Sequence, residues 1–218
     1  MAEKLIFLTS ERKAFEERAI TYEYFPGFAV SQKQKCIASL HKEIKRKYPD
    51  KKVLEISTKS MDPVGVKLSA FNLKFWHEEL QEYRNIENVF QSSKVFEGGG
   101  PYRDLLDVHP RTAKRDERLI SSGKLKCFEL YGTVWDLEPK TMFYDWLYIN
   151  ALMKAPELCE AMLEYDIFTD IEFNSNRSIN CQARSAAIYV SLVRNGKLEQ
   201  ALSDKEEFRR IYQTSARR

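Results

Sequence analysis

Apolar residues recur with two different periods along the chain, and this change of period predicts a mixture of helices and strands. Residues 4–9 and 53–57 are short apolar or β-branched runs with polar flanks, as strands are. Residues 124–135 have the same character and are interrupted at Gly132, so they predict a pair of strands. Longer segments with helical spacing fill most of the rest. The pattern therefore predicts an α+β fold in which helices dominate and the strands are few and short.

Helical spacing and helix-start residues place the expected helices. We expect helices at residues 32–48, 86–96, 111–121, 138–153, 156–165, 178–194 and 198–212. The first begins after Ser31, a helix-capping residue, and its inward stripe is Ile37, Leu40 and Ile44. Its other face carries six basic residues: Lys33, Lys35, Lys42, Lys45, Arg46 and Lys47. That face is either solvated or a contact for a nucleic-acid backbone.

Residues 86–104 concentrate groups that are capable of chemistry. A helix through this segment places Glu87, Gln91 and Lys94 at spacings of four and three, so the three share one face. Lysine side chains tilt toward the helix N-terminus, which recovers part of the rise of about 10 Å between positions seven apart. Glu87 can act as a general base or stabilise a developing cation, and Lys94 can bind an anion or attack as an amine. The structural alternative is the polar edge of an amphipathic helix.

Three glycines at residues 98–100 lead into Pro101, a residue suited to the first turn of a helix. Glycines before a helix start let a phosphate approach the free backbone N–H groups. The candidate binding residues here are Gly99, Gly100, Tyr102 and Arg103. The spacing is neither that of a Walker loop nor that of a dinucleotide-binding turn. This segment is therefore either a phosphate site or a flexible loop.

A third candidate lies near the C-terminal helices. Asp170 and Glu172 precede Asn180, which stands near the start of the helix expected at 178–194. Asn180 is either a helix cap or a ligand contact. Three aromatic residues belong either to the core or to a stacking surface for a base: Trp135, Tyr144 and Trp146.

Composition narrows the classes of function. The chain has 218 residues, 43% of them hydrophobic, and no repeat or low-complexity linker, which predicts a single domain. Because 35 Lys+Arg balance 32 Asp+Glu, any nucleic-acid contact must rest on a local patch. The four cysteines and three histidines lack metal-ligand spacing, so we expect free thiols, no metal and no cofactor. The absence of a signal peptide and of a long apolar run predicts a cytoplasmic protein without membrane contact.

Several segments, taken in order, resemble the NADAR superfamily, which includes the YbiA-like N-glycosidases of riboflavin metabolism. The matching positions are 68–72 (Leu-Ser-Ala-Phe-Asn), Glu87 with Phe90, Gln91 and Lys94, Trp135 with Lys140 and Met142, and Asp170 with Asn180. The resemblance implies one NADAR-like domain over residues 1–218 with a core at about 27–201. Residues 27–35, 90–96 and 178–185 are typical of the branch encoded beside guanosine-directed DarT toxins. Ala70 and the missing Trp-Gly-x-Gly also separate the chain from the riboflavin-type relatives.

The resemblance implies a hydrolase that cleaves the N-glycosidic bond between ADP-ribose and guanine in DNA, and thereby acts as antitoxin to a DarT-type ADP-ribosyltransferase. It implies the catalytic residues Glu87, Lys94 and Asp170. The implied substrate-binding residues are Ser69, Asn72, Gln91, Gly99, Gly100, Tyr102, Arg103, Trp135, Lys140 and Asn180. One alternative is an N-glycosidase of a free nucleotide-like metabolite. The other is an antitoxin that only binds ADP-ribose, or that binds the toxin directly.

Overall fold

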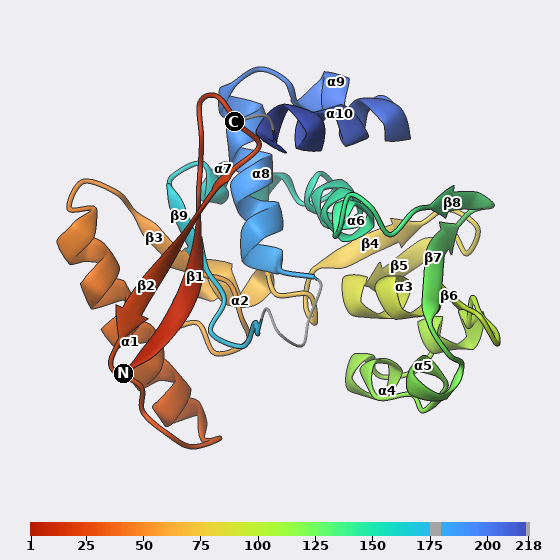
Figure 1. The fold of residues 1–218 in the computed structure, drawn as a ribbon, viewed down its shortest axis with the longest axis horizontal. Coiled ribbons are helices and arrows are strands. Elements are labelled where there is room, and N and C mark those ends of the chain that lie inside the picture. Colours follow the sequence, from red (N-terminus) through yellow and green to blue (C-terminus); the bar gives the residue numbers. More distant parts are fainter. Residues whose placement is uncertain (175–179, 217–218) are drawn as a thin grey trace.

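A four-stranded sheet with the strand order β2-β1-β9-β3 lies on the N-terminal side of the structure (Figure 1). The computed structural model describes residues 1–174 and 180–216. The strands of this sheet are β1 (Ala2–Leu8), β2 (Glu16–Tyr22), β3 (Val53–Glu55) and β9 (Ile167–Thr169). β1 runs antiparallel to β2 and to β9, whereas β3 and β9 are parallel. β1 and β2 precede residue 27, so segments outside the expected core contribute to the sheet.

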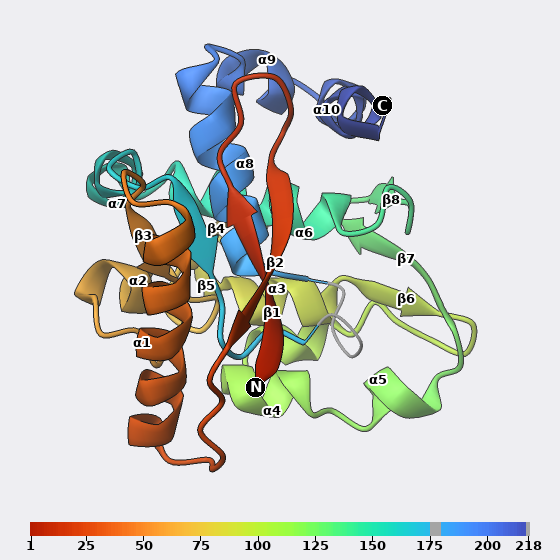
Figure 2. The same ribbon diagram turned by 60° about the vertical axis from the view of Figure 1, so that its left-hand side comes forward.

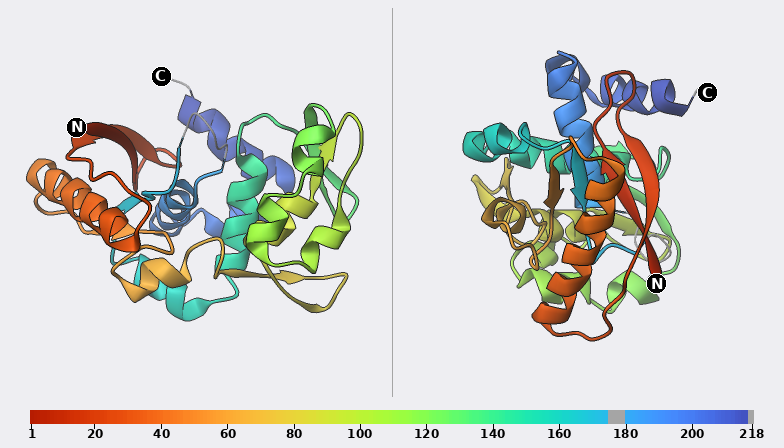
Figure 3. Two further views of the ribbon diagram at one scale, coloured as in Figure 1. Left: turned by 90° about the horizontal axis from the view of Figure 1, so that it is seen from below. Right: turned by 90° about the vertical axis from the view of Figure 1, so that its left-hand side faces the viewer.

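Helices α1 (Val30–Lys47) and α8 (Gln182–Arg194) cover the two faces of this sheet (Figures 2 and 3). Successive strand residues point to opposite faces, so β1 supplies both layers. Ile6 packs in the cluster on the α1 side, and its neighbour Phe7 packs in the cluster on the α8 side. The predicted stripe of α1, Ile37, Leu40 and Ile44, is buried, as its spacing predicted.

The other half of the molecule holds two small sheets and most of the short helices (Figure 1). Strands β4 (Lys74–His77) and β5 (Glu82–Asn85) form a hairpin. The second sheet contains β6 (Lys94–Phe96), β7 (Leu125–Leu130) and β8 (Thr133–Trp135) in that order. The helices of this half of the molecule are α3 (Ile86–Ser92), the 3₁₀ helix η1 (Arg103–Leu106), α4 (Pro110–Lys114) and α5 (Arg118–Ser121). Helix α2 (Pro63–Lys67) leads from β3 toward this half.

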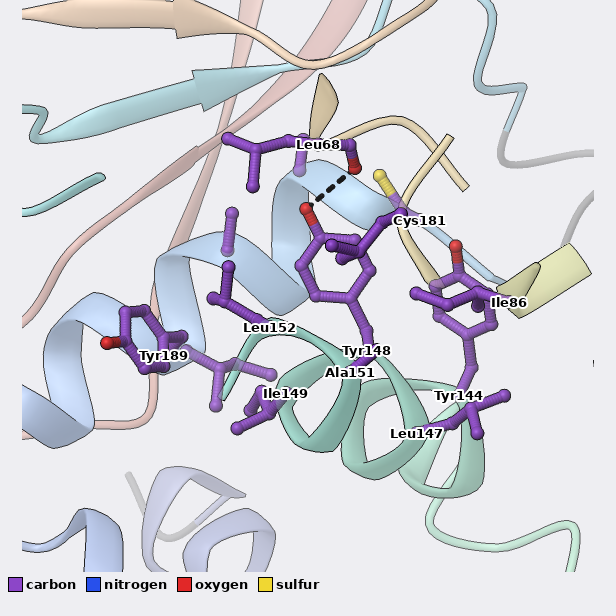
Figure 4. Close-up of a cluster of buried hydrophobic side chains, with 14 of the residues drawn as sticks. Leu68, Ile86, Tyr144, Leu147, Tyr148, Ile149, Ala151, Leu152, Cys181 and Tyr189 are labelled. Carbon is purple, nitrogen blue, oxygen red and sulfur yellow. Dashed lines mark hydrogen bonds between the residues drawn. The ribbon is translucent and has the colours of Figure 1, made fainter. Parts of the chain in front are cut away.

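Helix α6 (Met142–Leu152) joins the two halves because it is apolar on nearly all sides. The Tyr148 hydroxyl donates a hydrogen bond of 2.9 Å to the carbonyl oxygen of Leu68, which fixes the loop after α2 (Figure 4). Helix α7 (Pro156–Met162) follows α6, and α9 (Leu198–Leu202) and α10 (Lys205–Ala216) follow α8. Within the described residues, none of these helices is both long and apolar enough to cross a membrane.

The structure confirms the α+β, helix-dominated prediction and a single domain with small sheets. It corrects several boundaries. Lys94 begins strand β6, since helix α3 ends at Ser92. The helix expected at 111–121 is divided into α4 and α5, and the one expected at 198–212 into α9 and α10. The N-cap of α1 is Ala29 instead of Ser31. Of the helix expected at 178–194, positions 178 and 179 lie outside the described residues, and α8 begins at Gln182.

Candidate functional site

An inner cavity of about 410 Å³ lies where the two halves of the molecule meet. Its walls come from the loop after α2, from α3, α4 and α6, and from the segment that follows β9. The lining residues are Ala70, Phe71, Glu87, Lys114, Tyr144, Asp170, Glu172, Phe173, Asn174, Asn180 and Gln182. Two buried carboxyl groups, Glu87 and Asp170, therefore face one space.

An outer cavity of about 860 Å³ adjoins the inner one, because Phe71, Lys114, Glu172 and Gln182 line both. Most of its other charged residues are basic: Lys59, Arg111 and Arg115. The inner cavity thus presents carboxyl groups, and its approach presents cations that suit phosphate oxygens.

Glu87 lies in the first turn of α3 and is 1% exposed. The side-chain amide of Gln91, one helical turn later, donates a hydrogen bond of 2.8 Å to its Oε1. The ammonium of Lys114 lies 3.7 Å from the same oxygen. Asn85 precedes α3, and its side-chain amide donates to the carbonyl of Phe71 at 2.6 Å. These contacts hold the carboxylate and the neighbouring loop in a defined arrangement.

Lys94 lies beside this group, although it stands on β6 and not on the helix of Glu87. Its ammonium lies 5.0 Å from the centre of the Phe90 ring. Burial lowers the pKa of Lys94 to about 8; the Glu87 carboxylate opposes this shift and the Lys114 ammonium adds to it. An amine desolvated beside another cation is a recognised form of nucleophilic lysine. Lys94 is not among the residues that line either cavity in the described part of the chain.

Asp170 follows β9 and has different neighbours. Its Oδ1 accepts hydrogen bonds from the backbone N–H groups of Glu172 at 3.0 Å and Phe173 at 3.1 Å. Burial, and then the nearby carboxylate of Glu55, raise the pKa of Asp170 to about 7, and the Lys4 ammonium and the two N–H groups oppose this shift. Asp170 therefore exchanges its proton near neutral pH, as a catalytic acid or base must.

Glu55 and Lys4 fix the backbone next to Asp170. Glu55 is buried and accepts hydrogen bonds from the Thr169 hydroxyl at 2.6 Å and the N–H of Ile171 at 2.8 Å. The Lys4 ammonium donates to the carbonyl of Ile171 at 3.0 Å and to that of Phe173. Side chains from two strands of the large sheet, β3 and β1, thus fix the backbone around Asp170.

Tyr144 and Gln182 complete the inner wall. Burial raises the pKa of the Tyr144 hydroxyl well above its ordinary value, so this group stays protonated and can donate a hydrogen bond into the cavity. Figure 4 shows Tyr144 projecting from α6 near Ile86, the residue before Glu87. The Gln182 side chain donates to the carbonyl of Ile56 at 2.6 Å and accepts from the N–H of Ala70 at 2.7 Å. It therefore connects the large sheet to the loop that carries Ser69 and Asn72.

The structure brings together six of the catalytic and substrate-binding residues that the resemblance implied. Glu87, Asp170 and Asn180 line the inner cavity, Ser69 and Asn72 line the outer one, and Gln91 bonds to Glu87. The Ser69 hydroxyl oxygen is buried and has no hydrogen-bond partner among the described residues. Asn180 is not the helix cap, because the N-cap of α8 is Cys181.

Gly99, Gly100, Tyr102 and Arg103 lie elsewhere, and within the described part of the chain none of them lines either cavity. Gly100 has a φ of +90°, and a Cβ on it would lie 2.3 Å from the carbonyl oxygen of Lys94. This glycine thus permits a close backbone contact with β6. Arg103 forms ion pairs with Glu79 at 2.8 Å and Glu129 at 3.4 Å. A helix does not begin at Pro101, since η1 starts two residues later.

Trp135 and Lys140 also lie outside the cavity walls described here. Trp135 is 3% exposed and packs against Phe143 and Trp146 at ring-centre distances of 5.5 Å and 4.8 Å. It is a core residue, so of the three aromatic candidates only Tyr144 reaches the inner cavity. Lys140 is exposed, and its backbone N–H donates to Glu138.

Sequence reasoning missed Lys114, Arg111 and Gln182 as site residues. Lys114 and Arg111 stand in a segment that the helical pattern did identify, but a basic residue on a short helix has no local mark of function. Gln182 was part of a phrase used for the resemblance, without a role of its own. Its two long-range hydrogen bonds are visible only in the folded chain.

The fold and the site together define the class of protein: an α+β domain with a cavity that is lined by carboxyl groups and approached past basic side chains. The family model described as the DarT1-associated NADAR antitoxin matches residues 2–218. The match spans almost the whole sequence, so the chain belongs to this family of antitoxins that oppose DarT toxins. A comparison with curated proteins found no match.

Proposed function

We propose that this protein is an ADP-ribosyl glycohydrolase that removes ADP-ribose from guanine in DNA. The observation that carries the proposal is the inner cavity, where the carboxyl groups of Glu87 and Asp170 and the hydroxyl of Tyr144 face one space beneath a basic approach. Most enzymes that cleave a glycosidic bond through an oxocarbenium-like transition state use a pair of carboxyl groups. Because the chain belongs to a family of antitoxins, the reaction in this proposal reverses the modification that the toxin makes.

The two carboxyl groups have separate tasks in this proposal. Glu87 stabilises the positive charge that develops at the ribose carbon as the bond to guanine breaks. Asp170, with its pKa raised to about 7, donates a proton to the departing base. Lys114, Arg111 and Arg115, which line the outer cavity, bind the pyrophosphate oxygens in this proposal.

Lys94 has two possible tasks, and chemistry separates them. In the first, its ammonium supports Glu87 and a water molecule completes the reaction. In the second, the neutral amine, available because the pKa is lowered to about 8, attacks the ribose carbon, the bond to guanine breaks, and guanine leaves with the proton that Asp170 donates. The sugar ring then opens to give a Schiff base, and water hydrolyses this imine to free ADP-ribose and the regenerated amine. Borohydride reduces such an imine and leaves ADP-ribose attached to Lys94, whereas the first task leaves the protein unmodified.

The decisive experiment incubates guanine-ADP-ribosylated oligonucleotide with the wild-type protein and measures both free ADP-ribose and restored guanine. We expect both products in equal amounts, without added metal or cofactor. If the wild type releases no ADP-ribose, the hydrolase proposal fails. Binding of the intact modified strand without cleavage would instead support an antitoxin that only binds ADP-ribose. Cleavage of a modified mononucleotide in preference to the strand would support the metabolite N-glycosidase.

A further inference from the structure

An exposed aromatic loop lies between β2 and α1. Phe28 is 99% exposed and Tyr24 is 46% exposed, and Val30, the first residue of α1, is 48% exposed. Single exposed apolar residues are normal on a protein surface. Here three of them stand within seven residues, one a fully exposed phenylalanine, and such a concentration makes the loop a candidate binding surface.

The fold holds this loop in place, so the exposure of Phe28 does not result from a lack of structure. The N–H of Phe25 lies 3.2 Å from the sulfur of Cys36 on α1, and the Cys36 thiol lies 3.4 Å from the carbonyl oxygen of Phe25. The N–H of Glu23 donates to the Ser39 hydroxyl at 3.0 Å. Gly27 then turns the chain at a φ of +127°, a conformation that favours glycine. Phe28 is thus presented outward from an anchored turn.

The aromatic loop adjoins the candidate site. Lys33, in the first turns of α1, places its ammonium 3.6 Å from the carboxylate of Glu172. Glu172 lines both the inner and the outer cavity. In Figure 1 the start of α1 and helix α4, which supplies Arg111 to the outer cavity, both lie toward the bottom of the view, α1 at the left and α4 at the right. The Lys33–Glu172 ion pair therefore connects the first turns of α1, directly after the loop, to a wall that both cavities share.

A row of cations continues from the loop along α1. Lys35 and Lys42 are seven residues apart, so they share one face of the helix at a separation of about 10 Å. Lys45 lies one turn further on, and all three side chains are exposed. In residues 1–174 and 180–216 the structure shows no ion pair for any of the three. Aromatic rings and unpaired cations in sequence match the bases and phosphates of a nucleic-acid strand.

We propose that Tyr24, Phe28 and the exposed lysines of α1 bind the single-stranded nucleic acid that flanks the modified base. The aromatic rings stack on neighbouring bases, and Lys35, Lys42 and Lys45 pair with successive phosphates. This inference rests on the proposed function, because it is the strand carrying the modified base that the surface holds. It makes the surface, and not the cavity, responsible for preferring a polymer to a free nucleotide.

The test compares two substrates with one reacting group: a guanine-ADP-ribosylated oligonucleotide and the matching modified mononucleotide. Phe28→Ala and Tyr24→Ala should each lower kcat/KM for the oligonucleotide by about fivefold or more, the usual effect of losing one stacked base. Both variants should leave kcat/KM for the mononucleotide unchanged. Tyr83→Ala is the matched control, because Tyr83 is 49% exposed and lies on β5, away from the loop.

The lysines are tested by salt dependence. Removing Lys35 and Lys42 together should weaken oligonucleotide binding and reduce the slope of log Kd against log salt by about 0.7 for each lysine. Lys154→Ala, an exposed lysine after α6, should leave the slope unchanged.

Two results would overturn the proposal: normal cleavage of the oligonucleotide by Phe28→Ala and Tyr24→Ala, or equal losses on both substrates. In the first case, loss of binding to the purified toxin by the same variants would assign the surface to a protein partner. If the wild type cleaves neither substrate, the proposed function fails, but anisotropy with unmodified single-stranded DNA still tests the surface. Weaker binding by Phe28→Ala would then uphold it, and unchanged binding would reject it.

Discussion

The two buried carboxyl groups that face the inner cavity lie in different electrostatic surroundings. Glu87 stands on a helix with the amide of Gln91 and the ammonium of Lys114 at its oxygen. Asp170 stands on a loop above a second buried carboxylate, Glu55, and its pKa is raised to about 7 by burial and by that neighbour. Two chemically similar side chains thus acquire different properties from the elements that hold them.

This difference indicates a division of labour. A carboxylate beside cations and an amide donor suits the stabilisation of positive charge, and a carboxyl group that titrates near neutral pH suits proton transfer. The same contrast extends to the free energy of unfolding, because the buried negative charge that Asp170 carries at high pH destabilises the folded state. Substitutions at each wall of the cavity therefore test the comparison directly.

The largest effect is expected from Glu87→Gln. The amide keeps the shape of the side chain but removes the negative charge that stabilises the developing cation. The rate of ADP-ribose release should therefore fall by about 10²–10⁴-fold. A single-turnover assay measures this loss. Glu160→Gln on α7 is the matched control and should keep full activity. Activity of Glu87→Gln within twofold of wild type would remove Glu87 from the mechanism.

The next effect is expected from Lys94→Met, which keeps the length of the side chain without its amine. Whichever of its two tasks applies, the rate should fall by about 10²-fold, as is usual for a group that acts on charge or protons in the transition state. Lys126→Met, on the neighbouring strand β7, should leave the rate unchanged. Trapping by borohydride should increase as the pH rises toward 8, if the amine attacks. Full turnover by the wild type without trapping would assign the attack to water.

Asp170→Asn should change how stability depends on pH. The pKa of Asp170 is raised in the folded state. The contribution of Asp170 to the free energy of unfolding is therefore fully present below the ordinary pKa of this group, 3.8, and is lost as the pH rises through about 7. The free energy of unfolding of the wild type should therefore decrease between these values, and Asp170→Asn should show a smaller decrease. Denaturant titrations at pH 4, 5.5 and 7 measure it. Glu55, whose pKa burial also raises, accounts for the slope that remains. Parallel curves for the two proteins would contradict the assignment.

The smallest effects distinguish the basic approach from the glycine turn. Arg111→Ala should raise KM for the modified oligonucleotide about tenfold, the equivalent of ~1.5 kcal/mol for a charged hydrogen bond. Arg103→Ala should change KM by less than about twofold, since Arg103 is paired with Glu79 and Glu129 outside the cavities. Steady-state kinetics of the two variants side by side provide the measurement. The reverse order of effects would restore the glycine turn as the phosphate site.

Much of the fold follows from local patterns. The buried stripe of α1, the apolar helix α6 and the β7–β8 hairpin were predicted because their spacing or turn residues are visible in the sequence. The strands β2 and β5 were missed because most of their residues are polar, and β4, β6 and β9 were missed because each has only three or four residues. The breaks before α5 and α10 were also missed. There Asp116 and Asp204 accept hydrogen bonds from backbone N–H groups two residues later, a capping signal that the longer helical pattern obscured.

The sequence by itself determined the family, the helical fold class and the pairing of Glu87 with Gln91, because a spacing of four residues fixes neighbours on a helix. Only the tertiary structure decided that Lys114, Tyr144 and Asp170 meet Glu87 at one cavity and that the glycine turn does not reach it. Residues brought together across 27 to 83 positions meet through the packing of α3, α4, α6 and β9, which no local spacing encodes. The same packing sets the surroundings of each carboxyl group, and hence which of them is suited to carry a proton.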